Sequence, residues 1–185
     1  MPINLLLLSI LLLLPGYIFS DPKPKQSAMD TLQTVDHVNL EKYTGRWYEI
    51  AKIPNRFQRK CARNTTATYK LKNDGRIDVT NRCTESDGSV KESNGIAKVV
   101  EPSTNAKLKV SFVQILGFSL FWGDYWIIGL DDNYDYAVVG TPSRKYGWIL
   151  ARSPELSDVQ LDETFSILRD KGYNPDDFEM TVQRP

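Results

Sequence analysis

Eight short segments with strand character lie between residues 47 and 152, and turn signals separate them. In one segment, Ile77, Val79 and Asn81 alternate with more polar residues, which is the period of a half-buried strand. Asp74-Gly75 marks a tight turn just before it, because this pair readily adopts positive φ. We expect strands at residues 47–53, 65–71, 76–83, 90–100, 107–113, 124–130, 135–140 and 146–152. Their number and spacing predict an all-β fold: an eight-stranded antiparallel up-and-down barrel that holds one small ligand.

The pattern becomes helical after Pro154. Ser157 and Gln160 have the spacing of a helix-capping box, and Leu161, Phe165 and Leu168 follow on one helical face. Gly172 is a suitable residue to end this helix. We expect one C-terminal α-helix packed outside the barrel, followed by a short strand at 178–182.

The first twenty residues have the features of an export signal. Residues 5–14 form a ten-residue apolar run, too short to span a bilayer, and Ser20 is a small residue at its exit. We therefore expect a signal peptide at 1–20, a flexible linker at 21–36 and a barrel domain at 37–185. The alternative is an uncleaved membrane anchor. Export would place the protein in the periplasm or outside the cell.

Charge and residue content exclude several classes of function. The 23 basic and 23 acidic residues give a formal net charge of zero, and no basic run stands out, so no nucleic-acid partner is expected. His37 is the only histidine and precedes the barrel, so neither a metal cluster nor a histidine-dependent catalytic group is expected. We predict a small-molecule binding protein with no catalytic residues and no cofactor, rather than an enzyme.

Three separated motifs carry a family resemblance. Gly45-Arg46-Trp47 opens the first strand, Asp131-Asp132-Asn133-Tyr134 lies in a late turn, and Arg152 closes the last long strand. Their order and spacing resemble the signature regions of the lipocalin family. The runs GRWYEIAKIPNRF and KYGWILARSP are similar to the bacterial lipocalin and apolipoprotein D branch. Such relatives are often lipoproteins acylated at a cysteine, but no cysteine lies in the first sixty residues. Outer-membrane association stays an open alternative.

Barrel topology predicts where these motifs meet. Alternate loops of an up-and-down meander share one end, which brings Trp47, the turn containing Asp131 and Tyr134, and Arg152 together. The guanidinium can then stack on the indole by a cation–π contact worth roughly 0.5–2 kcal/mol. In the resembled family these residues, with Gly45, are structural. The alternative is that Trp47 and Arg152 bind ligand.

The inward face of each strand should line the cavity. From the alternation we take the ligand-binding wall to be Ala51, Tyr69, Val79, Asn81, Val110, Phe112, Trp126 and Ile128. The resemblance supports Tyr69 and Trp126, which match positions where apolipoprotein D-like members line their pocket. Small residues at Gly95 and Ala97 would leave room. The alternative is that the side chains fill the barrel completely.

The resemblance to bacterial lipocalins implies fatty acids or lysophospholipids as ligands, carried or stored in cell-envelope lipid maintenance. An apolar wall favours acyl chains by roughly 0.8 kcal/mol per buried CH₂. Glu49, Asn81 and residues 144–146 are candidates to meet the head group. A lipocalin-fold enzyme and an interaction module are the alternatives.

The connection at residues 114–122 is unusually apolar and falls at the open end of the barrel. Because connections are normally polar, it should contact a ligand, a membrane surface or another subunit. Phe118 and Trp122 are therefore further ligand candidates, and the chain is expected to be a monomer or a homodimer. The alternative is that this connection extends the neighbouring strands and packs inside the protein. Its apolar members are Ile115, Leu116, Phe118, Leu120, Phe121 and Trp122.

Cys61 and Cys83 are the two cysteines, and an exported protein with an even number favours one disulfide. A simple hairpin register through Asp74-Gly75 places Cys61 opposite about residue 88, so the bond requires a bulge or a folded loop. The alternative is two buried thiols. If the cysteines were free and Cys83 pointed into the barrel, a lipocalin-fold enzyme with a nucleophilic thiol would become the favoured alternative.

Overall fold

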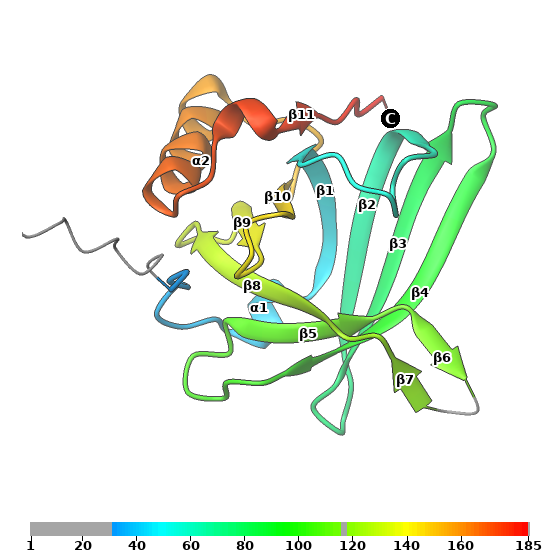
Figure 1. Cartoon of the computed structure of the whole chain (residues 1–185), viewed down its shortest axis with the longest axis vertical. Helices are drawn as coiled ribbons and strands as arrows, with labels where there is room; N and C mark the ends of the chain where they lie inside the picture. Colours follow the sequence, from blue (N-terminus) through cyan, green and yellow to red (C-terminus); the bar gives the residue numbers. More distant parts are fainter. Residues whose placement is uncertain (1–30, 116–117, 185) are drawn as a thin grey trace, which may run out of the picture. The chain divides into compact units, whose positions relative to one another are not determined.

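The computed structural model describes residues 31–115 and 118–184 (Figure 1). The expected signal peptide and residues 21–30 of the expected linker lie outside the described residues. Within the described part, no helix is both long and apolar enough to cross a membrane.

Eight antiparallel strands form a closed barrel, as predicted. Each strand pairs with the next along the chain, and the last strand pairs with the first, which closes the sheet. Short connections and alternating patterning explain this meander, because each hairpin places the next strand beside the previous one. The barrel strands are β1 Gly45–Lys52, β2 Cys61–Leu71, β3 Ile77–Glu85, β4 Val90–Val99, β5 Lys107–Ser111, β8 Gly123–Leu130, β9 Tyr136–Gly140 and β10 Gly147–Ala151.

The other elements lie at the ends of the barrel and on its outside. The capping box predicted for Ser157 and Gln160 begins the main helix, and Gly172 follows its C-cap residue with φ of +76°. Figure 1 shows this helix beside β8–β10 and a small hairpin, β6–β7, apart from the main sheet. These elements are α1 Leu40–Tyr43, β6 Val113–Ile115, β7 Phe118–Leu120, α2 Asp158–Asp170, the 3-10 helix η1 Pro175–Asp177 and β11 Glu179–Met180.

The buried residues form two hydrophobic clusters, one inside the barrel and one on its outside. The inner cluster fills the lower barrel and includes Trp47, Tyr69 and Ile127. The outer cluster joins α2 to the outer face of the barrel and includes Ile128, Ile149 and Leu168. Because α2 covers β8–β10, both faces of these strands are apolar, and alternation alone cannot tell which face points inward.

A β-bulge in β1 overturns one predicted wall position. The register with β10 shifts between Glu49 and Ala51, so Ala51 pairs with Ile149 and lies in the outer cluster. The predicted inward position of Ala51 is therefore wrong. The same bulge turns Lys52 inward, where it pairs with Trp148, a residue that packs against the inner cluster.

The predicted inward positions of Trp126 and Ile128 are also wrong. Both side chains belong to the outer cluster, whereas Tyr125 and Ile127 belong to the inner side. A second register shift, between Ile127 and Gly129, adds a residue to β8. The prediction failed because the outer face of β8 is also buried. Trp126 and Ile128 are therefore as apolar as the residues inside, and the alternation does not show which pair points inward.

The disulfide prediction is confirmed. Cys61 and Cys83 are bonded across the β2–β3 hairpin, with Cα atoms 5.6 Å apart. Register shifts between Cys61 and Arg63, and between Arg63 and Thr66, supply the bulges that the bond requires. Because both cysteines of the chain are bonded, the thiol on which the enzyme alternative depended is not available.

Candidate functional site

The closed end of the barrel is built from the three sequence motifs. The Arg152 guanidinium lies 3.8 Å from the centre of the Trp47 ring and donates hydrogen bonds to the carbonyl oxygens of Arg46 and Lys42, at 2.9 and 2.6 Å. The Trp47 indole N–H donates to the carbonyl oxygen of Tyr43 at the end of α1. Two of these contacts satisfy carbonyl groups at the end of α1, those of Lys42 and Tyr43, and the third bonds Arg46 at the start of β1, so this end is a plug.

The turn after β8 completes this plug. The Asp131 carboxylate accepts hydrogen bonds from the backbone N–H groups of Asn133 and Asp135, which holds the turn closed. Tyr134, at φ of +66°, accepts a hydrogen bond from the backbone N–H of Asn39, the N-cap residue of α1. The motif residues thus contact backbone groups and one another at the closed end.

The inner wall keeps accessible surface above this plug. Val110, Tyr125 and Trp148 pack against the inner cluster but are only half-buried. Alanines at positions 67 and 97 face the same space and take up little of it. Inward-facing side chains that retain accessible surface indicate a lumen rather than a fully packed barrel.

Three tyrosines form a chain of hydroxyl groups at the bottom of this lumen. The Tyr125 hydroxyl lies 2.8 Å from that of Tyr43 and 2.9 Å from that of Tyr69. Burial raises the pKa of Tyr43 and Tyr125 well above the ordinary value, and it raises the pKa of Tyr69 to about 12. All three hydroxyls are therefore protonated at neutral pH.

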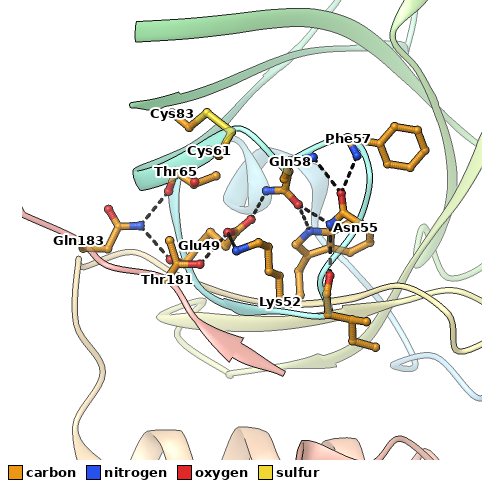
Figure 2. Close-up of polar contacts among 12 residues, drawn as sticks. Glu49, Lys52, Asn55, Phe57, Gln58, Cys61, Thr65, Cys83, Thr181 and Gln183 are labelled. Carbon is orange, nitrogen blue, oxygen red and sulfur yellow. Dashed lines mark hydrogen bonds and ion pairs between the residues drawn. A yellow bond between two sulfur atoms is a disulfide. The ribbon is translucent and has the colours of Figure 1, made fainter. Parts of the chain in front are cut away.

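A polar network occupies the open end, here called the mouth, where the β1–β2, β3–β4, β5–β8 and β9–β10 connections meet. Figure 2 shows Glu49, 3% exposed, at its centre. Its carboxylate accepts hydrogen bonds from the Thr181 hydroxyl, at 2.7 Å, and from the Gln58 side-chain amide. Lys52 Nζ lies 3.6 Å from Glu49 Oε1. Burial raises the pKa of Glu49, although these three partners oppose the shift.

The β1–β2 loop holds Gln58 over the lumen. Asn55 Oδ1 accepts hydrogen bonds from the backbone N–H groups of Phe57 and Gln58, which folds the loop back on itself (Figure 2). Gln58 Oε1 then accepts from Asn55 Nδ2, at 2.7 Å, and from the Trp148 indole, at 3.0 Å. An Asn at the start of a turn favours this local folding because its side chain bonds the backbone two or three residues ahead.

Aromatic rings continue this rim. The rings of Tyr146 and Trp148 are stacked with centroids 6.2 Å apart, and Phe57 lies 5.9 Å from Tyr146. Arg144, expected near a head group, instead donates from Nε to the carbonyl oxygen of Lys171 beyond the end of α2. The rim is therefore aromatic on this side.

The C-terminal segment closes a gap in the barrel wall. Thr181 N–H donates to the carbonyl oxygen of Ile50 on β1, and Asn64 N–H on β2 donates to the carbonyl oxygen of Val182. The Gln183 side chain donates to the backbone carbonyls of Glu49 and Thr65 (Figure 2). Residues 179–184 thus bridge β1 and β2 where the strands separate at the mouth.

In the apolar connection 114–122, the described residues 114–115 and 118–122 project rather than packing inside. Ile115 is 53%, Phe118 71% and Phe121 83% exposed, which contradicts internal packing of this loop. Trp122, expected at the open end as a ligand candidate, lies on the outside of the barrel, where Lys98 Nζ is 4.3 Å from its ring centre, which argues against a ligand contact. Ile115 and Phe118 lie on the two-stranded β6–β7 hairpin, and Phe121 and Trp122 follow it; among the residues that the structure describes, no third strand pairs with this hairpin.

The remaining wall predictions have mixed positions. Tyr69 and Val79 are buried in the inner cluster, and Val110 packs against it. Asn81 pairs with inward-facing Ala67 and is half-buried. Phe112 lies over Gly95 at the mouth: a Cβ at Gly95 would be 2.6 Å from the Phe112 ring. Gly95 therefore makes room for Phe112, not for a ligand.

Sequence reasoning missed Lys52, Gln58, Tyr43 and Tyr125. The bulge hid Lys52, and Gln58 belongs to a loop whose direction the sequence pattern does not set. The alternating Tyr125 and Ile127 were a readable signal for the inner face of β8, but Trp126 and Ile128 were equally apolar. Within the described residues, no group of acidic, cysteine or histidine side chains forms a metal site.

Two hollows on the outside do not coincide with the lumen. One, of about 430 Å³, lies at the rim beside the disulfide, between residues 59–62 and 85–87. The other, of about 280 Å³, lies between the C-terminal segment and the start of α2. The candidate ligand site is the lumen, because inward-facing apolar surface and the polar mouth occur together there.

Known proteins resemble the chain over most of its length. A protein-family model described as a lipocalin-like domain matches residues 38–183. The chain is 39% identical over 155 residues to temperature-induced lipocalin-1 of Arabidopsis thaliana, covering 82% of this chain and 83% of that protein. It is 36% identical over 167 residues to outer membrane lipoprotein Blc of Escherichia coli (strain K12), covering 90% and 88%. Apolipoprotein D of Macaca fascicularis is 36% identical over 157 residues, with 80% and 77% covered.

Solved structures give the same fold. Insecticyanin from the tobacco hornworm Manduca sexta superposes with a TM-score of 0.65 at 21% identity, covering 81% of this chain and 83% of that one. At this identity the similarity shows the fold alone. The family match and the relatives above, together with the closed barrel and its plug, show that this chain belongs to the lipocalin family.

Proposed function

We propose that this protein carries or stores an elongated amphiphile, a fatty acid or a lysophospholipid, in the maintenance of cell-envelope lipids. Lipocalins bind small hydrophobic molecules, and one relative of this chain is named an outer membrane lipoprotein. The observation that carries the proposal is an inward-facing lysine at the mouth, above a half-open apolar lumen. The acyl chain lies in the lumen, and the anionic head group lies near Lys52.

Lys52 suits this role because Glu49 engages it only partly. The side chain is 13% exposed, and its Nζ lies 3.6 Å from the Glu49 carboxylate, farther than a direct hydrogen bond. An ammonium has three donors, so donors remain for a carboxylate or a phosphate. A hydrogen bond to a charged group contributes roughly 1.5–3 kcal/mol, which is about a tenfold to hundredfold change in affinity.

Native mass spectrometry of protein from its own host, with lipid extraction alongside, is the first test. We expect a near-stoichiometric fatty acid or lysolipid. In a titration with both lipid classes, Lys52→Met should weaken binding about tenfold or more. Lys109→Met is the control, because Lys109 pairs with Asp124 on the outer face. An empty protein that also fails to take up either lipid refutes the carrier proposal.

We also propose that residues 1–20 are a signal peptide that directs export.

A second proposal is that the β6–β7 hairpin and the residues after it contact a membrane surface while lipid is exchanged. Support comes from the exposed rings of Phe118 and Phe121, since aromatic and aliphatic side chains suit the boundary between head groups and acyl chains. Phe118→Ser/Phe121→Ser should reduce co-flotation with phosphatidylcholine vesicles. Val159→Ser removes an apolar side chain of similar exposure on α2 and should leave co-flotation unchanged. Equal flotation of both variants would refute this contact.

A further inference from the structure

The three hydroxyl groups at the bottom of the lumen have one more proton than they use among themselves. Tyr43, Tyr125 and Tyr69 supply three O–H donors, but two oxygen–oxygen contacts join them, and each contact uses one proton. Within the described residues these hydroxyls have no other hydrogen-bond partner. Whichever way the chain of bonds runs, one O–H is left to donate elsewhere.

The spare O–H belongs to Tyr125 when both neighbours donate to it, and Tyr125 packs on the inner side of the barrel, toward the lumen. Tyr125 lies between the other two hydroxyls, pairs with inward-facing Leu108 on β5, and is the one tyrosine of the three that is only half-buried. Its neighbours along the wall are small or set back: Ala97 is on β4, and Gly123 pairs with Val110. A molecule in the lumen can therefore approach the Tyr125 hydroxyl from the mouth side.

We propose that the tyrosine hydroxyls form a second polar subsite, at the floor of the barrel, that accepts a neutral oxygen at the inner end of the ligand. The ligand class is then an amphiphile with an anionic head at the mouth and a ketone, hydroxyl or ester oxygen deep in its chain. This inference rests on the proposed function, because it assumes that an acyl chain occupies the lumen.

The chemistry of the floor favours a neutral oxygen over a carboxylate. A carboxylate needs several donors, and the floor has one O–H to give, so burying the anion there would leave most of its hydrogen-bonding capacity unmet. The charge of Arg152 acts on Tyr43, but its guanidinium stacks on Trp47 and donates to two backbone carbonyls. The tyrosines themselves stay protonated, because burial raises the pKa of each one.

A keto scan tests this subsite. Hexadecanoic acid is compared with a series of oxo-hexadecanoic acids that carry the ketone at successive positions from the middle to the far end. We expect one narrow range of positions to bind about two- to tenfold more tightly than the parent acid, as one neutral hydrogen bond allows. Ketones outside this range should bind more weakly than the parent, because their oxygen is buried against apolar wall.

The matched variants replace hydroxyl groups without changing ring volume. Tyr43→Phe/Tyr69→Phe/Tyr125→Phe removes the whole set and leaves no unpaired partner, so the affinity of the preferred ketone relative to hexadecanoic acid should fall to that of the other ketones. Tyr136→Phe is the control, because its hydroxyl donates to Glu163 on the outside. If the triple variant does not fold, a ¹³C-labelled ketone bound to the wild-type protein serves instead, since a hydrogen bond lowers its carbonyl stretching frequency.

The outcomes separate this inference from the carrier proposal. A position-dependent preference that the triple variant loses supports the floor subsite. Tight binding of hexadecanoic acid with no preferred ketone position, or with an unshifted carbonyl frequency, overturns the subsite and leaves the carrier proposal standing. Failure of every acid in the series to bind overturns both.

Discussion

Breaking the disulfide should cost this protein a large share of its stability. Cys61 and Cys83 close a loop with a sequence separation of 22 residues. In the chain-entropy account, a cross-link over this length lowers the entropy of the unfolded chain by about 11 cal/mol/K, or about 3.4 kcal/mol at 25 °C. For a domain of this size, that corresponds to a fall in Tm of roughly 7–14 °C.

Two preparations measure this effect. Wild-type protein reduced with dithiothreitol keeps both sulfur atoms, so it reports the loss of the cross-link alone. Cys61→Ala/Cys83→Ala also removes the sulfur of Cys83, which is 3% exposed, and should be less stable still because a small cavity remains. Urea denaturation with both preparations gives the two free energies of unfolding.

The local structure indicates where the loosening appears first. The bond lies next to the two register shifts in β2, where the ladder to β3 is irregular. Hydrogen exchange should therefore accelerate at the mouth end of β2 before the plug is affected. A reduced protein within about 1 kcal/mol of the oxidised one would refute the loop-entropy reasoning, because that loss is far below the predicted value.

Three further predictions concern the plug, the buried carboxylate and one glycine. Arg152→Lys should lower the free energy of unfolding by about 2 kcal/mol, because an ammonium cannot keep both carbonyl bonds and the stack on Trp47; equal stability in urea would contradict this. The folded protein raises the pKa of Glu49 from 4.5, so it binds this proton more tightly than the unfolded chain does. The stability advantage of wild type over Glu49→Gln should thus be largest below pH 4.5 and shrink as pH rises above it; urea titrations across pH that show a constant or growing difference would rule this out. Gly95→Ala should lower the free energy of unfolding by roughly 1–3 kcal/mol, because its Cβ would be 2.7 Å from a backbone oxygen. Gly123→Ala, whose Cβ would be 3.8 Å from its nearest atom, should be neutral or slightly stabilising. Thermal denaturation compares the two variants, and equal effects would show that the wall relaxes freely.

The class of fold was readable because its signals are local. Alternation in β3, the Asp74-Gly75 turn and the Ser157 capping box each depend on residues close in the chain, so the sequence pattern predicts them directly. The meeting of Trp47, the Asp131 turn and Arg152 also follows from the sequence, since a meander fixes which connections share an end. The disulfide required a bulge, and the structure contains one.

Which residues line the inner wall depends on contacts between segments that are distant in the chain. A bulge is a property of two paired strands, and the one after Glu49 sends Ala51 outward and Lys52 inward. Trp126 packs against the outer cluster, which contains Leu168 of α2, so an apolar residue here can face either side and the sequence pattern does not give its direction. The tyrosine hydroxyls meet only because α1, β2 and β8 converge at the floor. Local propensity specified the barrel, whereas strand pairing and helix packing selected which side chains face its interior.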